Sequence, residues 1–155
     1  MKLFDTSQRL ARLRRRNSER GAAAVEFALV LPLFLALLMG TIDYGYFFFT
    51  DQIVTNAARE GARAGTLVPP AAGSGKATDA ASAAAGAYLT ANGLGCPGGG
   101  AACIIPSEKM VTDDSITTPA IDVVIDFPAV SITGFTQMVR ILPRTVHGHA
   151  IMRWQ

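Results

Sequence analysis

The chain has 155 residues, of which 50% are hydrophobic and 17% are charged, and its mean hydropathy is +0.30. This length suggests one domain and excludes a large multidomain enzyme. The net charge of +2 averages two unlike parts, because residues 1–20 carry a net +5 and residues 21–155 a net −3. A uniformly basic nucleic-acid-binding protein would not divide in this way, so we expect no nucleic-acid partner.

The basic leader, residues 1–21, is followed by an apolar run over 22–42 in which Glu26 is the only charged side chain. A helix over this run reaches about 30 Å at ~1.5 Å per residue, which is enough to cross a bilayer. A core helix of a soluble protein would show polar residues with a 3.6-residue period, and 27–42 shows none. We therefore predict a transmembrane helix over 22–43.

The flanking charges predict the orientation of this helix. Five arginines lie within 12–20, whereas no Lys or Arg occurs from 21 to 58. The positive-inside rule then places the N-terminus in the cytoplasm and the rest of the chain outside. A cleaved secretory signal is an alternative, but its cleavage site would fall near Gly40–Asp43, which is a poor small-x-small sequence.

The helix is predicted to continue over 44–68 until Pro69 and Pro70 end it. Small residues line one side of this segment: Ala57, Ala58, Gly61, Ala62 and Gly65. Their spacing lets another helix approach closely, although packing on the chain's own domain would use the same spacing. The other side carries Arg59, Glu60 and Arg63, and the last two can pair across one helical turn.

Residues 69–155 are predicted to form a small α/β domain. Residues 69–77 are typical of a linker, and Thr78 and Asp79 are expected to cap a helix over 80–91 that stops at Asn92.

The rest of this domain favours strands. The alternation of apolar and mostly acidic residues over 121–127 predicts a strand, and 145–154 is expected to form the last one. Residues 130–132 are a candidate extension of the sheet, and 139–142 is compatible with helix or strand. The expected fold class is α+β, with a small antiparallel sheet beside the long helix.

No enzyme signature is complete, so we expect neither catalysis nor a cofactor. Residues 73–76 resemble part of a phosphate-binding loop, but Pro70 and Ala77 stand where that pattern needs Gly and Ser or Thr. His147 and His149 face one side of a strand and could bind a metal, but no Cys or further His lies nearby in the sequence. Four aspartates are compatible with calcium or with solvated positions: Asp113, Asp114, Asp122 and Asp126.

Cys96 and Cys103 are the only cysteines, and they flank a glycine-rich loop. Neither a four-ligand zinc site nor a C-x-x-C redox motif is present. If the loop lies outside the inner membrane, oxidation is permitted, so we favour a disulfide.

Glu26 is the residue that most needs an explanation. A charged group in the middle of a transmembrane helix costs about 2.5–3.5 kcal/mol on insertion scales, and less near the helix end. Glu26 therefore either lies at the cytoplasmic headgroup level or has a partner within the membrane.

Two stretches resemble the TadE-like family. The members of this family are minor pseudopilins of tight-adherence (Flp-type) pilus systems, and they are similar to type IV pilins. One is Arg20–Phe27 with the apolar run through Pro32, and the other is Asn56–Arg63. The resemblance implies that a prepilin peptidase cuts between Gly21 and Ala22, so that Glu26 becomes the fifth residue of the mature chain.

Further expectations follow from this resemblance. Glu26 would pair with the new amine of Ala22, its own or that of a neighbouring subunit, with Phe27 and Pro32 in the same assembly segment. The implied partners are the peptidase, other pilin or pseudopilin subunits, the pilus assembly platform and inner-membrane lipid. The protein would be a single-pass inner-membrane protein with a periplasmic C-terminal domain. The alternative is a signal-anchored periplasmic binding module that is neither processed nor assembled.

Overall fold

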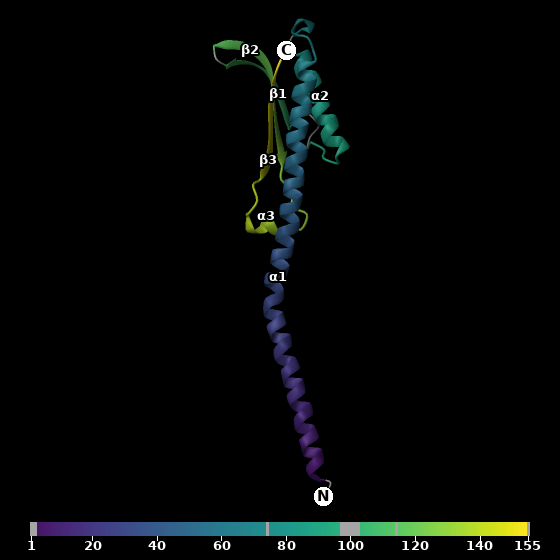
Figure 1. Ribbon diagram of the computed structural model, residues 1–155. Coiled ribbons are helices and arrows are strands. Elements are labelled where there is room, and N and C mark those ends of the chain that lie inside the picture. The colour runs from purple at the N-terminus through teal and green to yellow at the C-terminus, as the bar shows by residue number, and fades with distance from the viewer. Residues whose placement is uncertain (1–2, 74, 97–102, 114, 155) are drawn as a thin grey trace. The chain divides into compact units, whose positions relative to one another are not determined.

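The computed structural model describes residues 3–73, 75–96, 103–113 and 115–154 (Figure 1). The elements in chain order are α1 (Leu3–Thr66), the 3-10 helix η1 (Pro70–Ala72), α2 (Lys76–Ala91), β1 (Ile104–Asp113), β2 (Ile116–Pro128), α3 (Phe135–Val139) and β3 (Thr145–Arg153). They divide into two compact units, Met1–Thr41 and Ile42–Gln155. The α+β class expected from the sequence is confirmed.

The first unit is the N-terminal part of α1, which continues through Pro32 without a break. From Gly21 to Thr41 its apolar side chains are unburied on every side of the helix, for example Leu29 at 75% and Leu33 at 73% exposed. The most apolar window has a hydropathy of 2.4 and none of it is buried. A helix that is apolar on every side and unburied is expected where the surrounding solvent is lipid. This helix could span a membrane, in agreement with single-pass anchoring.

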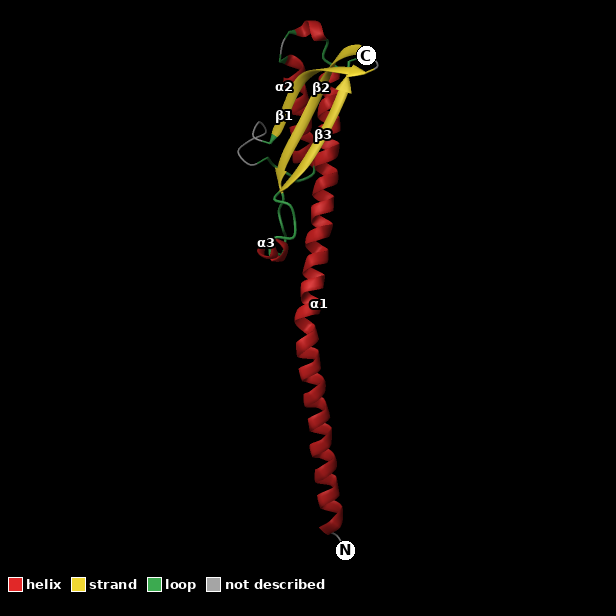
Figure 2. Ribbon diagram, turned by 90° about the vertical axis from the view of Figure 1, so that its left-hand side faces the viewer, coloured by secondary structure: helices red, strands yellow, loops and turns green. Residues whose placement is uncertain are grey.

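The second unit is built on a three-stranded antiparallel sheet in the order β1-β2-β3 (Figure 2). The register pairs Ile104 with Ile125 and Val124 with His149. In the central strand β2, Ile121, Val123 and Ile125 are fully buried. The period-2 alternation of a strand places these three side chains on one face, which forms one side of the core.

The C-terminal part of α1 and the helix α2 cover this core. The small residues of α1 are buried, and they meet a row of alanines in α2: Ala77, Ala81 and Ala85. A Cβ atom on Gly61 would lie 2.9 Å from the Ala81 carbonyl oxygen, and one on Gly65 would lie 3.0 Å from Ile121 Cγ2. The helix that approaches this face is therefore α2 of the same chain, with β2 beside it. The chain's own domain occupies the small-residue face.

Helix α2 begins earlier than the sequence predicted. Its N-cap is Gly75, with a left-handed φ of 87°, so the helix includes residues assigned to a linker. Thr78 does not cap the helix, because its hydroxyl donates a hydrogen bond back to the Gly75 carbonyl at 2.8 Å. The predicted stop is correct, since the helix ends at Ala91 with Asn92 as its C-cap.

Two further expectations for the C-terminal part change. Residues 130–132 do not extend the sheet, because they lie in the connection between β2 and α3. The Ser131 hydroxyl in this connection instead donates a hydrogen bond to Asp43 of α1. Of residues 139–142, only Val139 is helical, as the last residue of α3. The last strand, β3, lies where it was expected.

Candidate assembly segment

The residues expected at the processing and assembly site lie on one accessible stretch of α1. Gly21, Ala22, Glu26 and Phe27 are all exposed, and a Cβ atom on Gly21 would meet nothing within 4 Å. Residues 22 and 26 are four positions apart, so they share one face of the helix. If the chain began at Ala22, its amine would lie one turn from the Glu26 carboxylate, at the helix end that favours negative charge.

The charged side of the later part of α1 faces outward. Arg59 and Arg63 are exposed, and Arg63 Nε lies 3.4 Å from the Glu60 carboxylate. The side chains of Arg63 and Glu60 are 61% and 46% exposed, so water screens the pair and it contributes only a few tenths of a kcal/mol. These three residues remain accessible on α1, unlike the small residues on its other side.

Sequence reasoning overlooked Asp43, whose side chain accepts more hydrogen bonds than any other in the described part of α1. Asp43 is fully buried, although it follows the apolar run directly. One carboxylate oxygen accepts hydrogen bonds from the hydroxyls of Ser131 at 2.6 Å, Thr133 at 2.7 Å and Thr136 at 2.8 Å, and from the Thr136 amide at 3.2 Å. The other oxygen accepts from the Thr133 amide at 2.9 Å. We call these four residues the Asp43 latch.

The Asp43 latch connects segments that are 88–93 residues apart in the sequence. A buried carboxylate is stabilised only when hydrogen bonds replace its lost hydration, and five donors provide that here. The latch therefore holds the loop before α3 against the residue of α1 that follows the apolar run. The only local signal was an acidic residue directly after that run.

The sheet presents two histidines on one side, but each has its own aspartate. His147 Nδ1 lies 2.7 Å from the Asp126 carboxylate, and His149 Nε2 lies 2.7 Å from that of Asp122. Lys109 Nζ approaches Asp122 at 3.6 Å. Within the described residues, no three His, Cys, Asp or Glu side chains come together as a metal site would require.

The remaining candidates lie apart from these groups. Asp113 accepts a hydrogen bond from Arg153 at 3.2 Å, and Asp114 lies outside the described residues. Cys96 and Cys103 form a disulfide that closes the loop between α2 and β1. Residues 97–102, which include the glycines between the two cysteines, lie outside the described residues.

Comparison with known proteins identifies the segment that carries these residues. Residues 21–63 match the family model described as "TadE-like protein". No curated protein and no solved structure matches the chain. The matched range begins at Gly21 and includes Glu26, the exposed apolar helix and the arginines on the later part of α1. Residues 21–63 are therefore a TadE-like segment, which confirms the family resemblance, and this family implies involvement in Tad pilus systems.

Proposed function

We propose that this protein is a non-enzymatic minor pseudopilin that helps to assemble a Tad (Flp-type) pilus. A prepilin peptidase removes residues 1–21 at the cytoplasmic face of the inner membrane. The mature subunit then packs through its N-terminal helix against other pilin or pseudopilin subunits on the assembly platform. The observation that carries this proposal is the TadE-like match, which starts at Gly21 and contains Glu26.

The chemistry of Glu26 supports this proposal. Cleavage removes the basic leader and creates a cationic amine on Ala22. An amine and a carboxylate that pair in lipid offset the cost of leaving either charge alone. Because both charges have fixed positions along the helix, a pair between two subunits also fixes their axial register. The pairing gives Glu26 a role that a simple membrane anchor would not need.

The helix surface available to neighbouring subunits is the apolar run itself. The small-residue face of α1 is filled by α2 and β2, so it is not free for a second subunit. Most side chains over 25–39 are exposed instead, including Phe34 at 56% and Leu37 at 67%. Subunit packing through this run would exchange lipid contacts for van der Waals contacts between helices.

The experiment that tests this proposal compares two glutamates on the same helix. Glu26→Ala should leave membrane insertion and leader removal intact but strongly reduce the amount of the protein that cross-links to other pilus subunits. Glu60→Ala is the matched control, because Glu60 is about half exposed and makes only a weak pair with Arg63. Equal cross-linking of both variants and the wild type would refute the role of Glu26. An uncut, unassembled wild type would favour a signal-anchored binding module.

A further inference from the structure

The connection between β2 and β3 exposes an unusual number of apolar side chains. Five large apolar residues in this connection are between 48% and 83% exposed: Val130, Ile132, Met138, Val139 and Ile141. Exposed large apolar side chains that are concentrated in one short segment are typical of a surface that binds a partner or a membrane. The short helix α3 lies in the middle of this segment.

The Asp43 latch determines where this apolar segment lies. Ser131, Thr133 and Thr136 belong to it, and all three bond to Asp43. Asp43 follows Ile42, the last residue of the apolar run. In a chain whose run spans a bilayer, the latch therefore holds the exposed apolar residues at the membrane surface. Figure 2 shows α3 beyond the end of the sheet and beside α1, consistent with these bonds.

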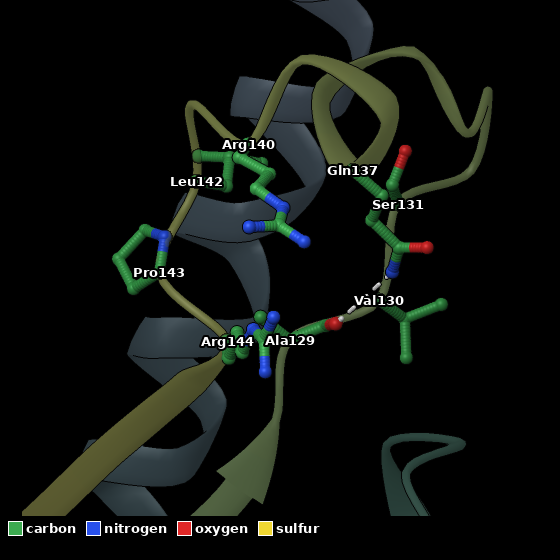
Figure 3. A pocket seen from close by; sticks show the side chains of 8 residues that line it. All are labelled: Ala129, Val130, Ser131, Gln137, Arg140, Leu142, Pro143 and Arg144. Atoms are coloured by element: carbon green, nitrogen blue, oxygen red, sulfur yellow. Dashed lines mark hydrogen bonds between the residues drawn. The ribbon is translucent and has the colours of Figure 1, made fainter.

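The same segment contains basic residues and no acidic residue of its own, and the Asp43 carboxylate that lies against it is buried and satisfied by the latch. After Asp126 the sequence contains no Asp or Glu, whereas Arg140 and Arg144 both lie close to α3. The two arginines line a pocket of about 580 Å³ together with Gln137 and Ser131. Figure 3 shows the Arg140 guanidinium directed into this pocket, with Arg144 across from it. Two guanidinium groups that face one space form a site suited to a phosphate group.

The backbone at Arg140 gives an independent indication. Arg140 is the C-cap of α3 and has a left-handed φ of 54°. Glycine is the residue that this position favours, because it has no Cβ to strain the backbone. Local backbone preference thus does not explain an arginine at this position. A binding role of its guanidinium in the pocket does explain it.

We propose that residues 130–144 are a second membrane contact, in which the apolar side chains enter the bilayer surface and the two arginines bind the phosphate of an anionic phospholipid. The attachment to Asp43, directly after the apolar run, and the absence of acidic residues within the segment both favour a lipid over a protein partner. The contact would hold the C-terminal unit on the membrane before assembly. It depends on membrane insertion of residues 22–43 and does not depend on leader removal or on Glu26.

The test uses two variants of the full chain in lipid vesicles. Each variant has one introduced cysteine that carries a fluorophore. Met138→Cys places the label in the proposed contact, where Met138 is 83% exposed. Met110→Cys is the matched control, because Met110 is 61% exposed on β1 and pairs with Pro119, near the other end of β2. Lipids brominated on their acyl chains then quench a label that enters the bilayer. The vesicles consist of phosphatidylcholine alone or of a mixture with phosphatidylglycerol.

The label at 138 should be quenched and the label at 110 should not, with stronger quenching when phosphatidylglycerol is present. Arg140→Gly suits the left-handed backbone and Arg144→Gln keeps a polar side chain, so both variants should fold. Each should lower the ratio of inserted to detached label roughly fivefold in anionic vesicles.

Three results would overturn the proposal. The label at 138 could stay as unquenched as the label at 110. Quenching could be the same in both lipids and in both arginine variants, which would exclude binding of an anionic phospholipid by Arg140 and Arg144. The label could be shielded from water only at high protein density, without quenching by the brominated lipid. That result would assign the surface to contact with a second copy of the chain.

Discussion

Removal of the Asp43 carboxylate is the perturbation whose effect the structure defines best. Five hydrogen bonds converge on this group, and their donors differ in their access to water. Ser131 and Thr133 lie close to solvent, so their groups can be hydrated when the carboxylate is absent. Thr136 is only 1% exposed, so its amide and hydroxyl would lose their acceptor without gaining water.

These contacts give different magnitudes for two substitutions. An unsatisfied buried donor costs about 1–3 kcal/mol, so Asp43→Ala, which strands two donors, should cost about 2–6 kcal/mol. Asp43→Asn keeps one oxygen, and the neighbouring hydroxyls can rotate to accept from its amide. Only the Thr136 amide would then face another donor, so this variant should cost about 1–3 kcal/mol.

The assay is thermal unfolding of the full chain in detergent micelles, followed by circular dichroism. For a unit of this size, the midpoint should fall about 3–5 °C for each kcal/mol lost. Hydrogen exchange over 129–144 should accelerate more than exchange in β2. Asp51→Ala is the control, because Asp51 lies on the same helix and accepts no side-chain hydrogen bond among the described residues. An unchanged midpoint and unchanged exchange in Asp43→Ala would refute this reasoning.

Two further predictions concern the C-terminal unit. A Cβ on Gly148 would lie 2.6 Å from the Val54 carbonyl oxygen, so Gly148→Ala should cost about 1–3 kcal/mol in thermal unfolding. Gly45→Ala on exposed α1 meets nothing within 4 Å and should instead gain up to about 1 kcal/mol; equal effects would contradict the helix–sheet contact. Replacing Cys96 and Cys103 with serine should cost about 2–3 kcal/mol by loop-closure entropy, measured against the oxidised wild type; reduction that leaves the midpoint unchanged would exclude this contribution.

Elements with a local pattern could be predicted from the sequence. The apolar run has one kind of surroundings on every side, and the strand from Ile121 to Phe127 buries every second residue. In both cases residues that are close in the sequence form the pattern, so the sequence alone predicts the element. Strand β1 gave no such pattern, because Ile104 is its only buried residue. As an edge strand it also accommodates Pro106, whose missing amide hydrogen would disturb a central strand.

Contacts between distant parts of the chain could not be predicted. Small residues at four-residue spacing fit a helix of another subunit as well as α2, and only the structure identifies α2 as the partner. The Asp43 latch depends on hydroxyls that lie 88 or more residues away, and the alternation of residues 130–132 favours a strand, which gives Ser131 no expected partner on α1. The hydroxyls of Ser131 and Thr133 are explained by their hydrogen bonds to Asp43, which only the structure shows.

The most direct test of the pilus assignment is the N-terminal residue of the purified membrane protein. In cells with an active prepilin peptidase, the account predicts a chain that begins at Ala22. Cells that lack the peptidase, or that carry Gly21→Asp, should yield the chain with its leader attached. A wild-type chain that keeps residues 1–21 in the presence of the active peptidase would contradict the account.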